Sequence, residues 1–252
     1  MTAHHLDGQR DIAWLEPRAA DLTRRVTEDL IIPEVDICCG LVEIPVEDAL
    51  RVLPPALHPA IPGLVGLYTY SAPESPIGAF NMVFVGVLAR SGVKPRLMVT
   101  AGFIDNAEAG RLLSSGWGFP LEVADVRLAV NYDRVRTTVA RDGRLLLSFE
   151  VQHPVAMTGA GSTLRYPQPF NLTRSEGGLK FVQFDASYGF ERVARGHPRI
   201  TYCDPDLVGG VEVSDDFPVT GTLAKAKMTL HPIRYVAETA TRAEDGGVSQ
   251  LS

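Results

Sequence analysis

The sequence predicts a mainly β fold, either a closed barrel or a pair of packed sheets, with a few helices. Residues 96–104, 125–141 and 144–152 are rich in β-branched and large apolar residues, which favour strands. Asp142-Gly143 separates the last two segments and is a strong hairpin-turn signal. Many antiparallel strands combined with few helix signals are typical of barrels and packed sheets.

The first 32 residues are predicted to form an extension, helical in part, that contacts the domain or a neighbouring subunit. Apolar residues recur there at roughly helical spacing: Trp14, Leu15, Leu22, Val26 and Leu30. Pro17 marks a break or a first helical turn.

Residues 33–238 are predicted to form the main domain. One helix is expected in VEDALRVLP, where Pro54 ends it, and another in NAEAGRLLSSG, with Asn106 as the N-cap and Gly116 at its end. Residues 179–194 alternate polar and apolar side chains like a further strand. The small, polar segment 239–252 is predicted to be a disordered tail.

The composition excludes several classes of protein. A net charge of −6 over 252 residues argues against a nucleic-acid binder. The apolar run 77–89 is shorter than the roughly 20 residues of a membrane helix, and the N-terminus has no signal-peptide pattern. Three cysteines without regular spacing favour a reduced protein. We therefore expect a cytoplasmic location, without nucleic-acid or membrane partners.

General catalytic and cofactor motifs are missing from the sequence. It contains no P-loop, dinucleotide fingerprint, nucleophile elbow or His-Glu-x-x-His motif. Four of the six histidines precede a proline, which favours strand ends and turns over a ligand cluster. Neither a metal site nor an organic cofactor is expected.

The segment FIDNAEAGRLLSSGWGFPLEVADVRL, residues 103–128, resembles the acetoacetate decarboxylase superfamily. RYPQPFNL, RGHPRITYCDPD and DFPVTGTLAKAKMTLHPIRYV resemble later family segments in the same order, so the resemblance spans roughly residues 33–238. It implies an antiparallel β-barrel with an enclosed cavity, a few flanking helices, a homo-oligomer and a late helix carrying Lys225 and Lys227.

The resemblance fails at the centre of the implied active site. Two lysines follow Phe-Pro in the decarboxylases, and the first forms a Schiff base with the substrate ketone. Here these positions are Leu121 and Glu122. The implied acidic pocket positions fall near Leu67 and Met82, and the pocket arginine falls near Asp36. Leucine cannot form an imine, so decarboxylation through a lysine is not expected.

Three residues are candidate catalytic groups. Glu122 either shuttles a proton from a buried position or points outward and is solvated. Tyr70 either polarises a carbonyl group or only packs, and Asn81 either stabilises an oxyanion or occupies a turn or edge. Glu150 is expected to face water on the polar side of its strand.

Apolar residues are expected to bind the substrate. Replacement of polar pocket residues by apolar ones implies a more apolar cavity and a larger, more hydrophobic substrate. The candidate substrate-binding residues are Leu67, Tyr68, Met82, Trp117, Phe119 and Leu121.

The sequence thus predicts a lysine-independent enzyme of secondary metabolism. We expect an acid–base lyase, cyclase, dehydratase or isomerase that acts on a hydrophobic, polyketide-like carbonyl compound. Two alternatives stay open: a non-catalytic small-molecule binding protein that uses the same cavity, and a structural or assembly component.

Overall fold

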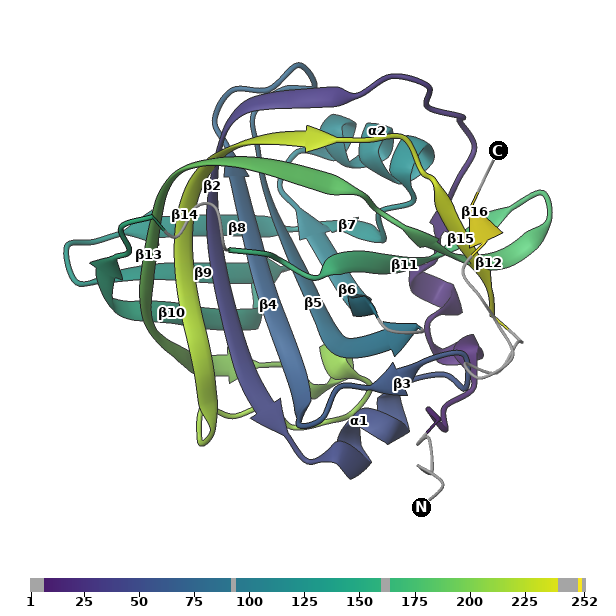
Figure 1. Cartoon of the computed structure of the whole chain (residues 1–252), viewed down its shortest axis with the longest axis horizontal. Coiled ribbons are helices and arrows are strands. Elements are labelled where there is room, and N and C mark those ends of the chain that lie inside the picture. Colours follow the sequence, from purple (N-terminus) through teal and green to yellow (C-terminus); the bar gives the residue numbers. More distant parts are fainter. Residues whose placement is uncertain (1–6, 92–93, 160–163, 240–248, 251–252) are drawn as a thin grey trace.

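The computed structural model describes residues 7–91, 94–159, 164–239 and 249–250, which form one large mixed sheet with two α-helices (Figure 1). The helices are α1 Val46–Val52 and α2 Ala107–Trp117, and the 3-10 turns are η1 Ile12–Trp14, η2 Glu16–Arg18 and η4 Pro205–Val208. The strands are β1 Ala20–Asp21, β2 Leu30–Ile44, β3 His58–Pro59, β4 Gly63–Ala72, β5 Phe80–Ser91, β6 Lys94–Ile104, β7 Leu121–Val123, β8 Asp125–Val130, β9 Arg134–Arg141, β10 Arg144–Ala156, β11 Gln168–Ser175, β12 Gly178–Gln183, β13 Ala186–Cys203, β14 Pro218–Leu230, β15 Tyr235–Glu238 and β16 Ser249–Gln250.

The strand order along the sheet is β16-β15-β12-β11-β6-β5-β4-β2-β14-β13-β10-β9-β8. Most neighbouring strands are antiparallel, but β6 pairs in parallel with β11 near its start and with β7 near its end. The sheet curls until β8 lies against β5 and β6. In Figure 1, α2 crosses one end of the central strands and α1 lies at the other end. The prediction of a mainly β fold is confirmed.

The central strands bury both of their faces, and alternate side chains enter two separate hydrophobic cores. On β4, Val65 and Leu67 enter one core, whereas Tyr68 and Tyr70 enter the other. We call them core 1 and core 2. Core 1 lies inside the curled sheet and includes Cys38, Leu67, Val85, Phe103, Leu147, Phe149 and Leu207. Core 2 lies on the opposite face, under α2, and includes Ile37, Cys39, Tyr68, Tyr70, Met82, Phe84, Leu113, Trp117, Phe119 and Met228.

Local sequence signals placed both helices and one hairpin correctly. The Asn106 side chain accepts hydrogen bonds from the N–H groups of Glu108 and Ala109, at 3.0 and 3.1 Å. Helix α2 continues to Trp117, one residue beyond its predicted end. Asp142 and Gly143 both have positive φ, as a two-residue hairpin turn between β9 and β10 requires.

Three strand and helix boundaries differ from prediction. Residues 125–141 form two strands, because the Asn131 N–H bonds to the Arg134 carbonyl and closes a turn. Residues 179–194 divide between β12 and β13, because the Phe184 N–H leaves the ladder and bonds to Pro169. The prediction of a late helix carrying Lys225 and Lys227 is wrong. These residues lie in strand β14, which pairs with both β2 and β13.

The N-terminal segment packs on the domain. Its described part forms η1, η2 and β1, and Leu15 is buried in core 1. The Arg10 guanidinium lies 4.3 Å from the centre of the Trp14 ring. Residues 1–6 lie outside the described structure, and the predicted subunit contact stays a prediction.

The predicted C-terminal tail falls mainly outside the described structure. Residues 240–248 and 251–252 are not described, whereas Ser249 and Gln250 pair with β15. Within the described ranges, no helix is long and apolar enough to cross a membrane.

We predict that Gly118→Ala lowers the free energy of unfolding more than Gly143→Ala does. The φ values are 70° and 77°, and left-handed backbone costs alanine about 1–2 kcal/mol. A methyl group at Gly118 would also overlap Cγ2 of Thr173 on β11, whereas nothing lies within 4 Å of one at Gly143. Urea unfolding of both variants measures the difference. Equal losses of unfolding free energy in the two variants would mean that β11 moves to accommodate the methyl group at no cost in stability.

Candidate active site

Strand β7 carries the position at which the resemblance places the Schiff-base lysine. Helix α2 ends at Trp117, Gly118 reverses the chain in the left-handed conformation, and β7 starts at Leu121 beside Gly102 of β6. A Cβ at Gly102 would lie 2.6 Å from the Pro120 carbonyl oxygen, so only glycine allows this close approach. The turn and this close approach together fix the orientation of β7.

Leu121 faces core 2. Its side chain is partly buried there, and a Cβ at Gly102 would lie 3.3 Å from Leu121 and 3.2 Å from Phe84. Phe84 in turn packs edge-to-face on Phe119, with 5.3 Å between ring centres. The surroundings of position 121 are therefore apolar and aromatic.

Glu122 points to the other face of β7. Its cross-strand partner Phe103 belongs to core 1, and its side chain is 35 % exposed. The carboxylate forms ion pairs with Arg141 and, at 3.7 Å, with Arg18. The sequence left a buried position and an outward-pointing one open for Glu122. The side chain is partly exposed on the core 1 face, and it borders a hollow of about 380 Å³. Its catalytic role stays a prediction.

Four tyrosines gather in and beside core 2, and we call Tyr68, Tyr70, Tyr166 and Tyr188 the tyrosine cluster. The hydroxyl groups of Tyr70 and Tyr188 are 3.3 Å apart. Tyr166 packs edge-to-face on Tyr68 and on Tyr188, with ring centres 5.8 and 5.6 Å apart. The sequence predicted Tyr68 and Tyr70 as site residues but missed the other two, which lie on segments far apart in the chain.

The tyrosine cluster remains protonated at neutral pH. Burial is the main cause that raises the pKa values of Tyr68 and Tyr70 well above the usual value, and it also raises that of Tyr166. Burial raises the pKa of Tyr188 to about 12. The cluster therefore supplies hydrogen-bond donors and no base.

Two of the polar side chains on the core 2 face lack a hydrogen-bond partner among the described residues. Tyr68 is 1 % exposed, and its hydroxyl makes no hydrogen bond of normal geometry. It interacts with the neighbouring Cys39 thiol, which is a weak hydrogen-bonding group. Asn171 is 0 % exposed, and neither atom of its amide has a partner.

Asn171 lies at the point where β11 stops pairing with β6, and further along β6 the paired strand is β7. The β11–β6 ladder ends at Phe170 opposite Met98, and both side chains enter core 1. Asn171 is the next residue and faces the opposite side. Thr173 shares that face and meets the α2–β7 turn at Gly118. Sequence reasoning missed Asn171, because a lone asparagine in a strand gives no signal.

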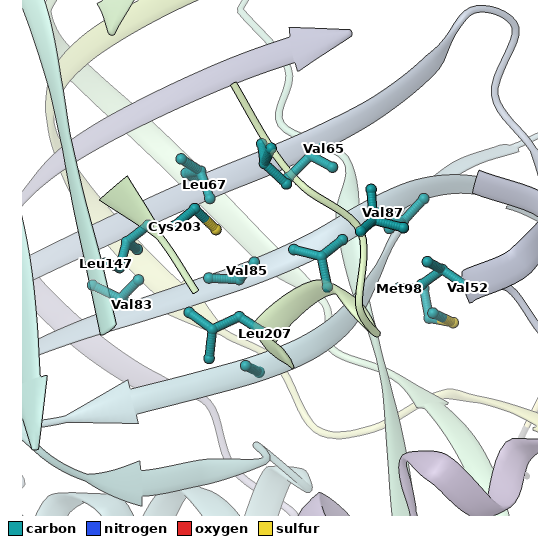
Figure 2. Close-up of a cluster of buried hydrophobic side chains, with 14 of the residues drawn as sticks. Val52, Val65, Leu67, Val83, Val85, Val87, Met98, Leu147, Cys203 and Leu207 are labelled. Atoms are coloured by element: carbon teal, nitrogen blue, oxygen red, sulfur yellow. The ribbon is translucent and has the colours of Figure 1, made fainter. Parts of the chain in front are cut away.

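The remaining predicted residues divide between three places. Met82 pairs with Tyr70 across β4 and β5 and enters core 2, as does Phe119. Trp117 lies at the edge of core 2, where its indole N–H donates to the His231 carbonyl at 3.0 Å. Leu67 enters core 1, among Val83, Leu147 and Cys203 in Figure 2, because it alternates with Tyr68 along β4.

Asn81 is also separate from core 2. At the start of β5, its side-chain amide donates to Asp105 at 2.7 Å, and its backbone N–H donates to the same carboxylate. This matches the edge position that the sequence left open for it.

Glu150 departs from the prediction of a solvated strand face. Its side chain is 2 % exposed and accepts hydrogen bonds from Arg136 and Gln152. Burial acts to raise its pKa, but these hydrogen bonds outweigh burial and lower it. The expectation failed because arginines of β9 cover this face of the strand.

Comparisons with solved structures show the same fold in enzymes of known type. An acetoacetate decarboxylase from Legionella pneumophila is 14% identical, with a TM-score of 0.69 over 84% of this chain and 88% of that one. The enduracididine biosynthesis enzyme MppR, complexed with pyruvate, is 14% identical, with a TM-score of 0.65 over 83% and 90%. An acetoacetate decarboxylase-like enzyme from Sphingomonas wittichii RW1 is 14% identical, with a TM-score of 0.57 over 87% and 91%.

Sequence comparison agrees with the fold. No curated protein sequence matches the chain. Residues 34–186, more than half of the chain, match the profile of acetoacetate decarboxylase (ADC). The chain therefore belongs to the acetoacetate decarboxylase family.

Proposed function

We propose that this chain is an enzyme that binds a hydrophobic carbonyl compound in core 2 and acts on it without a lysine imine. The observation that carries the proposal is a pair of buried polar side chains on the face that Leu121 also shares: Asn171, without a hydrogen-bond partner among the described residues, and Tyr68, whose hydroxyl has only the weak Cys39 thiol beside it. Buried polar groups are rarely left unpaired, because each loses about 1–3 kcal/mol of solvation. The carbonyl oxygen of a ligand between them would accept hydrogen bonds from the Tyr68 hydroxyl and from the Asn171 amide N–H.

The placement of the lysines supports a reaction without an imine. Lys180 pairs with Glu238 at 3.2 Å, Lys225 pairs with Glu34 at 2.7 Å, and Lys227 is exposed on β14. The side chain of the fourth lysine, Lys94, is not among those that the structure describes. None of the three described amines lies in core 2, and Leu121 occupies the implied position.

The available groups favour chemistry in which negative charge develops on a carbonyl oxygen. Protonated phenols of the tyrosine cluster can donate to that oxygen, and one such donor commonly contributes 10²–10³-fold in rate. The buried carboxylates among the described residues, Glu150 and Asp204, are held by Arg136 and Arg144. A donor-rich site without a free carboxylate suits an intramolecular cyclisation or a dehydration in which the substrate reacts as its enol. The enol O–H proton passes to the new alkoxide in the cyclisation, or leaves with the departing hydroxyl as water in the dehydration.

The aromatic lining supports a large, apolar substrate of the polyketide type. Phe84, Phe119 and Phe184 form a continuous edge-to-face series next to Tyr70. MppR, which shares the fold, has been captured with the condensation product of pyruvate and imidazole 4-carboxaldehyde. A related carbonyl condensation by this chain is part of the proposal.

A non-catalytic binding protein is the second candidate. The observation that favours it is the hydrogen bond between the Tyr70 and Tyr188 hydroxyls, which occupies donors that a catalyst would direct at substrate. Both candidate functions use the same site, so a turnover assay distinguishes them and a binding assay does not.

We predict that the tyrosine cluster does not ionise in the folded protein at pH 11. The folded-state pKa values lie above the unfolded value near 10, so the folded state binds more protons between about pH 10 and 12. Stability is therefore complete below pH 10 and falls as pH rises through this window. Absorbance at 295 nm should show the four cluster phenols titrating together with unfolding. Their ionisation in a protein that remains folded would contradict the described burial.

We predict that Tyr70→Phe lowers turnover of a hydrophobic β-hydroxyketone or 1,3-diketone by about 10²–10³-fold and changes its binding less than tenfold. Dehydration, cyclisation and α-proton exchange in D₂O, followed by NMR, measure turnover, and calorimetry measures binding. The control is Tyr132→Phe, which removes a fully exposed hydroxyl. Binding without any turnover in the wild type would favour the second candidate. A borohydride-trapped imine would overturn the lysine-independent mechanism.

We predict that Asn171→Leu stabilises the protein and weakens ligand binding. Removing an unpaired buried amide should raise the free energy of unfolding by about 1–3 kcal/mol in the absence of ligand. The same change removes the hydrogen bonds that the amide would make to a carbonyl compound. Urea unfolding and calorimetric titration with the same diketones test both halves. Unchanged binding would remove Asn171 from the site.

A further inference from the structure

A hollow of about 970 Å³ lies at an end of the barrel, away from Leu121 and Glu122. It is enclosed by β8 and β9 on one side and by β2, β13 and β14 on the other. Most of its lining is apolar and includes Leu128, Val130, Val135, Phe190, Val193 and Leu223. None of the predicted site residues contributes to it. The mouth of a β-barrel is a common place for a small-molecule site.

One carboxylate in this hollow lacks an ion pair among the described residues. Asp36 on β2 stands directly opposite Lys225 on β14, yet the Lys225 ammonium bonds to Glu34 at 2.7 Å instead. Arg192, the other cation near Asp36, has Glu191 as its ion-pair partner at 4.0 Å. Both cations are therefore matched by other acids, and Asp36 leaves one negative charge in excess.

The position of Asp36 makes this charge costly. The carboxyl is half-buried, and burial is the main cause that raises its pKa, while Lys225 acts in the opposite direction. A carboxylate in partly apolar surroundings is stabilised by a cation that brings its own apolar cover.

Exposed apolar side chains surround the opening. Val130 is 71 % exposed and Met157, just after β10, is 42 % exposed, and both line the hollow. Groups of exposed apolar side chains around a hollow mark surfaces that bind something apolar.

We propose that this barrel-end hollow binds an amphipathic amine, whose ammonium group pairs with Asp36 and whose apolar body contacts Leu128, Phe190 and Leu223. The hollow borders core 2: Ile37, Val193 and Ala224 belong to both, and Phe190 lines the hollow and stacks on Tyr188 of the tyrosine cluster, with ring centres 5.6 Å apart. The inference rests on the hollow and its charges, not on the proposed carbonyl chemistry.

Calorimetric titration at pH 7 with octylamine, 1-octanol and octanoate tests the proposal. The three probes share an alkyl chain and differ in charge. Octylamine should bind most tightly and octanoate least. Asp36→Asn should weaken octylamine at least tenfold and leave octanol unchanged. Equal binding of octylamine by wild type and Asp36→Asn would overturn the proposal.

Two further variants separate a specific pair from general charge and from loss of the fold. Glu47→Gln removes one exposed negative charge from helix α1, away from the hollow, and leaves Asp36 and the ion pairs around it, so it should change octylamine affinity less than threefold. Leu223→Trp fills the hollow and should abolish binding of both octylamine and octanol, with circular dichroism as the check on folding. Binding that survives Leu223→Trp would place the amine elsewhere and overturn the proposal.

A second copy of the chain is the competing occupant of this face. Light scattering of wild type and of Val130→Asp with Met157→Asp decides between the two occupants. A wild-type oligomer that becomes a monomer in the double variant would overturn the amine proposal. The same oligomeric state in both, together with saturable octylamine binding, supports it. Because the carbonyl assays act on core 2, failure of either proposal leaves the other testable.

Discussion

The double burial of the central strands is the constraint on which the rest of the structure depends. Strand β4, most of β5 and the middle of β2 are buried on both faces, so each successive side chain there must suit one of two cores. A shift of one residue in register would exchange Leu67 with Tyr68 and place phenols inside core 1. The hydrophobic pattern therefore fixes the register, and the register decides which side chains can meet at the candidate site.

The same alternation separates the two residues at which the sequence resemblance places the family's lysine pair. Leu121 and Glu122 are neighbours in the chain but lie on opposite faces of β7, one beside Phe84 and the other between Arg18 and Arg141. A carboxylate paired with two guanidinium groups is satisfied where it is. The polar groups on the core 2 face come instead from β4 and β11, together with Tyr166 and β13.

Core 2 and the barrel-end hollow use polar groups in different ways. In core 2, protonated phenols and an amide are buried without charge, which suits a neutral ligand with a carbonyl oxygen. In the hollow, a half-buried carboxylate stands unpaired, which suits a cation. Phe190 lines the hollow and stacks on Tyr188, so the two chemically distinct environments share this wall of the curled sheet.

The sequence by itself determined the mainly β class, both α-helices and the Asp142-Gly143 turn, because caps, turn residues and side-chain periodicity act over a few residues. Of the predicted site residues, Tyr68, Tyr70, Met82, Trp117 and Phe119 belong to core 2, and their roles stay predictions. Only the tertiary structure decided that Tyr166, Tyr188 and Asn171 join them, that Leu67 does not, and that Asp36 has no ion pair within the described part of the chain. These facts depend on which distant strands pair and how the sheet curls, and such long-range contacts leave no local pattern in the chain.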